Sequence, residues 1–380
     1  MNVEEVKCIA ARRQREAIQL VQKLRYDTTN NPTVESIIEG LQSASLNCNE
    51  VGTEDIFKDC ETFKQEFLQK IPANMVVCSI TFDVKRHDMY LCRMESGCES
   101  VVFKLPLQRQ STRDGETEGL TFDKAMRQFQ DIMQESQNTI NELKGVENVS
   151  RDQIRKWRTG RMALDKRLGS FLSEVESVWL GGFKGLLSTV SFESKGVFSL
   201  LDLFKTRLET LILKVVTTST AARAKLVKFD IGLCNAILRI GRLTDNYKEI
   251  EDILYYLMDI YQYSGAAALY DEVNVDTLTE EIKDLIESFY DDLENFHADT
   301  SQYRTEKHLV LILDKYAQQI PWESIPILSG KSVSRLPSAQ FLAERLTKSF
   351  SAGREDVYYV LNPSKDLDKT QERFQPELLG

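Results

Sequence analysis

Histidine is scarce in this chain, and several familiar site patterns are missing. Only three histidines occur among 380 residues, at positions 87, 297 and 308. Seven cysteines occur, but none forms a CxxC pair, and the interval from Cys92 to Cys98 is not a usual zinc spacing. No dinucleotide fingerprint is present, and Gly330-Lys331-Ser332 lacks the first glycine of a phosphate-binding loop. The sequence therefore predicts no metal and no cofactor.

Long apolar runs are absent as well. No run approaches the ~18 residues that a membrane-spanning helix needs. The amino terminus is charged and amphipathic, whereas a secretory signal is apolar. The odd number of cysteines and the missing signal favour free thiols in a reducing compartment. We therefore expect no membrane contact.

Positive charge is in short supply overall but is unevenly distributed. The net charge is −10, which argues against direct binding to nucleic acid. Residues 141–240 contain 17 Lys and Arg against 10 Asp and Glu, whereas residues 241–300 contain 3 against 16. We interpret the acidic stretch as a solvated helical face, and a docking site for a basic partner is the alternative.

Apolar periodicity predicts a mostly helical chain with a small sheet near the start. Alternation in residues 76–107 predicts three antiparallel strands, and the polar segment 108–119 is interpreted as a mobile loop. Gly181-Gly182 is expected to end or bend a helix. Helices are expected at residues 10–24 and 33–41, between 120 and 187, and through most of 188–300. One apolar stripe is expected to face the core: Leu164, Leu168, Phe171, Leu172, Val175, Val178 and Trp179.

The last part of the chain predicts a parallel sheet. The run Leu309–Leu313 is typical of a strand buried on both faces. A helix at 338–350 and a strand at 357–361 would complete a βαβ unit, whose crossover implies parallel strands. We divide the chain into N-terminal helices (1–70), a helical region with the small meander (71–305) and an incomplete α/β domain (306–380).

Two segments closely resemble separase, a caspase-like cysteine endopeptidase. The first is WRTGRMALD, which contains Trp157 and Gly160, with the segment from Trp179 to Leu187 after it. The second is DK…PWES…RLPS, which contains Asp314, Pro321, Trp322, Glu323, Arg335 and Pro337. The resemblance and the periodicity together predict an α+β fold, mostly helical with a small antiparallel meander, followed by the opening βαβ of a caspase-like parallel sheet.

The resemblance implies a function, but it assigns no catalytic residue. Separases cut the kleisin subunit of cohesin at anaphase and are held inactive by securin. Their catalytic histidine lies in a His-Gly motif after a later strand, and the catalytic cysteine follows the next one. None of the three histidines here precedes a glycine, and all seven cysteines precede residue 306. We therefore expect a non-catalytic N-terminal portion of a separase, inactive alone.

The resemblance also implies partners and a location. The chain resembles the insect arrangement, in which the helical-repeat arm is a separate polypeptide. Securin and that arm are the expected partners, with cohesin kleisin as substrate of the complete enzyme. The expected location is the cytoplasm, with access to chromosomes and spindle in mitosis, and the nucleus is possible. The alternative is a non-enzymatic interaction module that binds securin or the arm without cutting.

The PWES segment has a predicted structural role. Pro321 should keep Ile320 extended, and Trp322 offers a large apolar body to the edge of the core. Glu323 would then be drawn inward and would need a cation, because a buried lone carboxylate is costly. Arg335 is the predicted partner. The alternative is that Glu323 shapes a substrate site.

Overall fold

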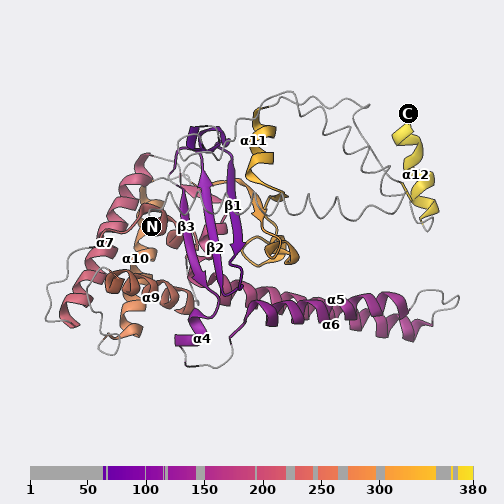
Figure 1. Cartoon of the computed structure of the whole chain (residues 1–380), viewed down its shortest axis with the longest axis horizontal. Helices are drawn as coiled ribbons and strands as arrows, with labels where there is room; N and C mark the ends of the chain where they lie inside the picture. Colours follow the sequence, from indigo (N-terminus) through magenta and orange to yellow (C-terminus); the bar gives the residue numbers. More distant parts are fainter. Residues whose placement is uncertain are drawn as a thin grey trace.

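The computed structural model describes a helical body built on one mixed sheet, with a helical hairpin that projects from it (Figure 1). The residues it describes are 63–65, 67–98, 100–113, 115, 119–142, 150–192, 195–219, 227–242, 247–263, 273–296, 304–347, 361–362 and 367–379. The helices predicted at 10–24 and 33–41 lie outside these residues, as do residues 357–360 of the predicted last strand. None of the helices described is long and apolar enough to cross a membrane.

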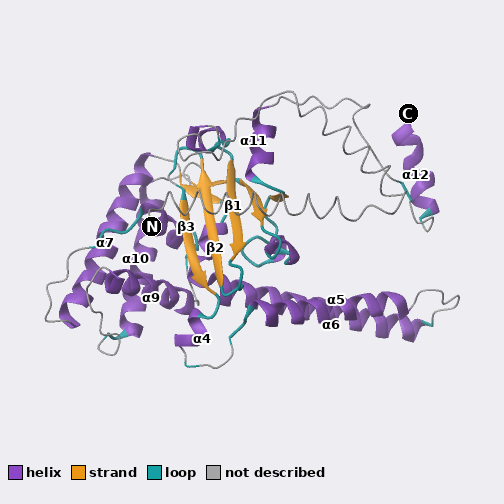
Figure 2. Cartoon of the chain, in the orientation of Figure 1, coloured by secondary structure: helices purple, strands orange, loops and turns teal. Residues whose placement is uncertain are grey.

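The main sheet has five strands in the order β3-β2-β1-β6-β7 (Figure 2). Strands β1, β2 and β3 form the predicted antiparallel meander, and β1, β6 and β7 run parallel to one another. Their bounds are Met75–Phe82 (β1), Asp88–Glu95 (β2), Val101–Pro106 (β3), His308–Leu313 (β6) and Val333–Leu336 (β7). A small second sheet pairs Val190–Phe192 (β4) with Arg304–Glu306 (β5).

Two features of the sheet differ from the sequence prediction. The meander and the strand at 309–313 belong to one sheet, because β1 pairs directly with β6 over residues 75–80 and 308–313. The described parallel neighbour that follows β6 along the chain is β7, a strand that the sequence analysis missed because it is short and only half-buried. The link between them holds two 3-10 turns, Ala317–Gln319 and Trp322–Ser324, and no α-helix.

The two faces of the sheet are covered by different elements. On one face Val76, Cys78 and Ile80 join a large core that extends through the helical body. On the other face Val77 and Val310 pack with a small cluster from helix α11 and residues 67–71. Both faces of β1 and β6 are therefore buried, which explains why Leu309–Leu313 is continuously apolar.

Helices account for most of the other residues that the structure describes, and α10 packs against both α7 and α9. The predicted helix at 338–350 is α11, whose described bounds are Ala339–Thr347. The polar C-terminal segment contains a further helix, α12. The helices are α4 (Arg109–Arg113), α5 (Phe122–Glu142), α6 (Arg151–Val175), α7 (Lys195–Ser219), α8 (Ile231–Leu238), α9 (Tyr247–Tyr263), α10 (Val275–Phe296), α11 and α12 (Asp368–Leu379). Short helical turns lie at Leu68–Lys70, Glu176–Leu180 and Gly181–Leu187.

Helix α6 begins and ends where local chemistry dictates. The Ser150 side chain accepts from the backbone of Gln153 while the Gln153 side chain accepts from the backbone of Ser150, which is a capping box. The helix continues as a π-helical turn and stops at Gly181, whose φ of 51° suits glycine. This is the helix end predicted from Gly181-Gly182. Of the predicted stripe, Phe171, Leu172, Val175 and Trp179 are buried, and Leu164, Leu168 and Val178 are partly buried.

The segment predicted as a mobile loop contains a helix with buried contacts. Arg109 and Arg113 on α4 both form ion pairs with Asp252 of α9, at 2.7 and 2.8 Å. Arg109 also donates to the carbonyl oxygens of Trp179 and Leu180. The polar sequence of 108–113 therefore reflects a buried charge network.

Candidate functional site

The carboxyl ends of the parallel strands β1 and β6 meet at one edge of the sheet. In open α/β sheets this edge is where ligands usually bind. Asp314 follows β6 there, and its carboxylate accepts from the backbone amides of Phe82, Tyr316 and Ala317 at 2.7–2.9 Å. Burial raises the pKa of Asp314, and these three hydrogen bonds oppose that rise. Asp314 therefore ties the end of β1 to the start of the link.

The PWES turn packs into the core below this edge. Ile320 is extended, with φ −99° and ψ 136°, as expected for a residue before Pro321. The Trp322 side chain is fully buried, and its Nε1 donates to the Ala317 carbonyl oxygen at 2.8 Å. Its ring centroid lies 6.4 Å from that of Trp179. The aromatic body of the link is thus held against the helical body.

Arg335 holds the same link from β7. Its Nη2 donates to Glu323 Oε2 at 2.6 Å, and its Nε donates to the other carboxylate oxygen, so the predicted ion pair forms. Arg335 also donates to the carbonyl oxygens of Gln318 and Ile320. The hydrogen bond from Arg335 lowers the pKa of Glu323, and both side chains are about one-third exposed.

The two segments identified by sequence contact each other. Besides the contact of Trp179 with Trp322, Glu176 Oε2 accepts from the backbone amide of Ile327 at 2.7 Å. Lys184 pairs with Glu249 at 2.5 Å and lies 3.7 Å from Glu176. The turn after α6 and the PWES link therefore form one junction, which we call the WLGG–PWES junction (residues 176–187 and 314–336).

Glycines allow the junction to pack closely on α8 and α9. A Cβ atom added to Gly185 would lie 2.0 Å from the Ala236 carbonyl oxygen, and one on Gly182 would lie 2.4 Å from that of Glu249. Real side chains do not fit at such distances. The apolar, glycine-rich run from Trp179 to Leu187 is therefore explained by backbone packing.

Other predicted residues lie away from this junction or carry no side-chain contact there. Trp157 and Gly160 are on the projecting hairpin, where Trp157 Nε1 donates to the Thr139 carbonyl oxygen at 2.9 Å. A Cβ atom on Gly160 would meet nothing within 4 Å. Pro337 is exposed between β7 and α11. Two buried charge networks were missed: Glu95 with Arg93, Arg239 and Lys307, and Asp252 with Arg109 and Arg113. Most of their members come from distant segments that no local pattern links.

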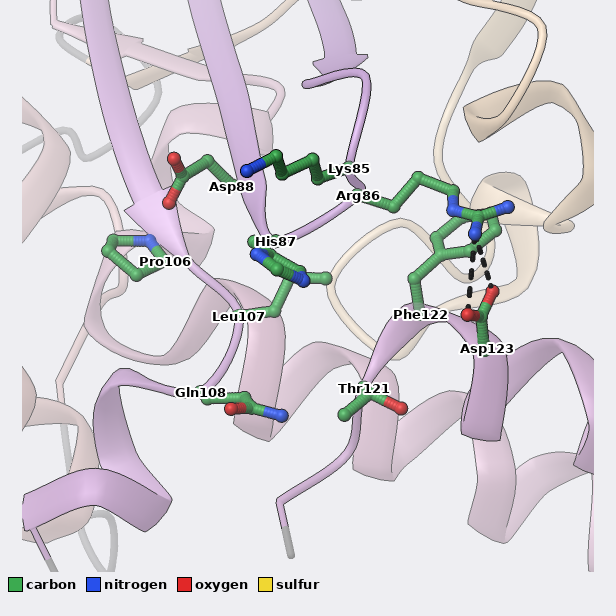
Figure 3. A pocket seen from close by; sticks show the side chains of 10 residues that line it. All are labelled: Lys85, Arg86, His87, Asp88, Pro106, Leu107, Gln108, Thr121, Phe122 and Asp123. Atoms are coloured by element: carbon green, nitrogen blue, oxygen red, sulfur yellow. Dashed lines mark hydrogen bonds and ion pairs between the residues drawn. The ribbon is translucent and has the colours of Figure 1, made fainter.

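A pocket of about 350 Å³ opens at the carboxyl edge, beside the β1–β2 turn (Figure 3). Arg86 in this turn has a positive φ of 59°, and its guanidinium lies over the rings of Phe122 and Tyr316. A second pocket of about 280 Å³ shares Arg86, Phe122 and Asp123 with the first. The first pocket is lined by Lys85, Arg86, His87, Asp88, Pro106, Leu107, Gln108, Thr121, Phe122 and Asp123. It is a polar surface of mixed charge and contains no cysteine.

Cys78 and His308 both have hydrogen-bond partners other than each other. Cys78 donates to the Leu186 carbonyl oxygen, and the His308 ring lies between the hydroxyls of Ser332 and Ser334. Burial raises the pKa of Cys78 to about 11 and that of Cys234 to about 12, whereas a nucleophilic cysteine needs a lowered pKa. Among the described residues, no group of three or more His, Cys, Asp and Glu could hold a metal ion.

Comparison with known proteins decides the family. The family model described as the protease domain of separin matches residues 84–379. The chain belongs to the separin protease-domain family. The separin of Schizosaccharomyces pombe is 31% identical over 330 residues, which cover 84% of this chain and 17% of that protein. Mouse separin is 27% identical over 325 residues, which cover 82% of this chain and 13% of that protein.

A solved structure supports the fold of this separin-family chain. The Saccharomyces cerevisiae separase–securin complex at 3.0 Å matches with a TM-score of 0.65 and 21% identity, covering 84% of this chain and 21% of that chain. The separase resemblance and the α+β, caspase-like fold predicted from sequence are confirmed. The chain spans between 13% and 19% of the length of four curated separins that it matches.

Proposed function

We propose that this chain forms part of a separase that cleaves the kleisin subunit of cohesin to release sister chromatids, and that it binds securin. The observation that carries the proposal is the match to the separin protease domain across residues 84–379. The structural neighbours are separases in complex with securin, which supports securin as a partner here. We also propose a separate helical-repeat arm as partner, and a location in the cytoplasm with access to mitotic chromosomes.

Within that enzyme, we assign the described residues a supporting role. They form the carboxyl edge of a parallel sheet and fix it through the WLGG–PWES junction. The described thiols with raised pKa values are poor nucleophiles, and neither His87 nor His308 precedes a glycine. Peptide hydrolysis needs a thiolate and a base within hydrogen-bond reach, and we assign neither role to a described residue.

Two experiments test the proposal. The purified 380-residue chain, incubated with a cohesin kleisin fragment, should show no cleavage. Cleavage that persists through a second purification step and is blocked by thiol alkylation would contradict the supporting role.

The tagged chain, recovered from dividing cells and analysed by mass spectrometry, should bring securin with it. Recovery of neither securin nor any cohesin subunit, from cells that contain both, would contradict the separase assignment.

A further inference from the structure

The helical hairpin formed by α5 and α6 projects from the body of the molecule (Figures 1 and 2). Its two helices are held together on their inner faces. Trp157 donates to the Thr139 carbonyl oxygen, and Arg161 Nη1 donates to Ser136 Oγ at 2.7 Å. Leu164 and Leu168 are partly buried on the same side. The opposite side of α6 is therefore turned to solvent.

The outer side of α6 carries four cations that pair with no described residue, and one exposed carboxylate, Asp165, borders them. Arg151, Arg155, Arg158 and Lys166 are spaced 4, 3 and 8 residues apart, which places them on one helix face about 22 Å long. All four are exposed, and none forms an ion pair with a described residue. Arg167, nearer the side of α6, does pair with Glu135 at 2.7 Å. We call the four unpaired cations the basic stripe.

An exposed apolar side chain lies in the middle of the basic stripe. Met162 falls between Arg158 and Lys166 on the same face, and it is 74% exposed. Ile154 borders the stripe and is 36% exposed. Exposed apolar groups among unpaired cations are typical of a surface that contacts a partner. Burial of the apolar groups and neutralisation of the cations would both favour a complex.

We propose that the basic stripe and Met162 form a docking surface for an acidic segment of a partner protein, with an apolar residue between its carboxylates. The four cations call for carboxylates on the partner segment, and Met162 calls for an apolar residue between those carboxylates. A protein segment is favoured over nucleic acid because it can place an apolar side chain against Met162, whereas a phosphate backbone cannot. The proposal does not depend on the proposed function.

Fluorescence anisotropy with defined probes tests this surface on the full chain. The probe is a labelled peptide of about 20 residues, about 30 Å long as a helix, with glutamate and leucine at helical spacing. A second peptide replaces each leucine by glutamine, and a DNA duplex of similar length is the third probe. The triple variant R151E/R155E/R158E reverses the basic stripe. The matched variant K228E/K248E/K369E makes the same charge change at exposed lysines elsewhere.

The expected result is that the leucine-containing peptide binds and that added salt weakens the complex. Stripe reversal should raise the Kd at least about tenfold, whereas the matched variant should change it less than about twofold. The variant Met162→Ser should raise the Kd about threefold for the leucine-containing peptide and leave the glutamine peptide unchanged. Circular dichroism of each variant checks that the hairpin is still folded.

Three results would overturn the proposal. The parent chain fails to bind either peptide, or both triple variants lose binding equally, which would show only an effect of net charge. Alternatively, the DNA duplex binds more tightly than the peptides and is lost on stripe reversal, which would make the occupant a nucleic acid.

Discussion

The WLGG–PWES junction and the projecting hairpin share a continuous helix but lie in opposite surroundings. At the junction Trp179 and Trp322 are fully buried and lie in contact, and Gly185 is pressed against a backbone carbonyl. On the hairpin Trp157 is half-buried, and Gly160 faces open space. Both segments resemble separase in sequence. Close packing among the described residues explains the residue types of the junction but not those of the hairpin. The resemblance of the hairpin segment to separase is therefore better explained by what the hairpin contacts than by its contribution to stability.

The largest expected effect is the loss of a junction tryptophan. Trp322→Ala removes a fully buried indole and its hydrogen bond to Ala317, so it should lower the free energy of unfolding by about 3–5 kcal/mol. Trp157→Ala removes a half-buried ring with a similar hydrogen bond and should cost about 1–2 kcal/mol. Urea denaturation of both variants checks the difference. Equal costs would show that the hairpin is as tightly packed as the junction.

A buried carboxylate on β2 should have nearly as large an effect. Glu95 pairs with Arg93, Arg239 and Lys307, all buried. Burial alone would raise the pKa of Glu95, but these three cations outweigh it and bring the pKa down from 4.5 to about 2. Because the folded-state pKa is depressed, the contribution is present above about pH 4.5 and is lost as the pH falls towards 2.

Glu95→Gln should therefore cost about 3–5 kcal/mol at neutral pH, since it leaves buried cations unpaired. The cost should shrink on acidification, because the parent then loses the same charge. Urea midpoints of parent and variant, measured from neutral pH down to about pH 3, check this convergence. A difference that stays constant across the range would mean that the charge of Glu95 is not what stabilises the network.

Local patterns predicted the elements better than their assembly. The alternation at 76–82 and the apolar run at 309–313 identified β1 and β6, because strand burial leaves a direct mark on the sequence. Their pairing across more than 220 residues left no such mark, so the meander was assigned to another region. The Asp252 contacts of α4 were missed for a related reason, because Arg109 and Arg113 find their shared partner 143 and 139 residues away. Strand β7 was missed because it is short and only half-buried.

Among the candidate site residues, a contact within one segment could be predicted and a contact between distant segments could not. The pairing of Glu323 with Arg335 could be predicted, because both lie within one short segment with few cations. Glu176 could not be connected to Ile327, since 151 residues separate them and nothing in either segment names the other.

The next effect comes from adding one methyl group. Gly185→Ala places a Cβ atom 2.0 Å from the Ala236 carbonyl oxygen, so α8 must shift, at a cost of about 2–3 kcal/mol. Gly160→Ala meets nothing within 4 Å in the interior of α6 and should instead stabilise by about 0.5–1 kcal/mol. Thermal melts of the two variants should move in opposite directions. A destabilising Gly160→Ala would reveal a packing requirement on the hairpin.

The smallest expected effect is at the Glu323–Arg335 pair. Both side chains are about one-third exposed, so solvent screens the attraction between them. In Glu323→Gln, Arg335 would still donate to the carbonyl oxygens of Ile320 and Gln318 and would not be left without partners. We therefore expect a loss of about 1 kcal/mol at neutral pH.

The hairpin offers a matched control for this prediction. Glu135 pairs with Arg167, and both side chains are about half exposed, so Glu135→Gln should cost less than about 0.5 kcal/mol. Because Arg335 lowers the pKa of Glu323, the advantage of the parent over Glu323→Gln should be lost as the pH falls below the ordinary range of a glutamate. If Glu323→Gln unfolds at the same urea concentration as the parent at neutral pH, the pair contributes nothing to the sheet edge. Glu323 would then be free for the other role considered from the sequence, which is to shape a substrate site.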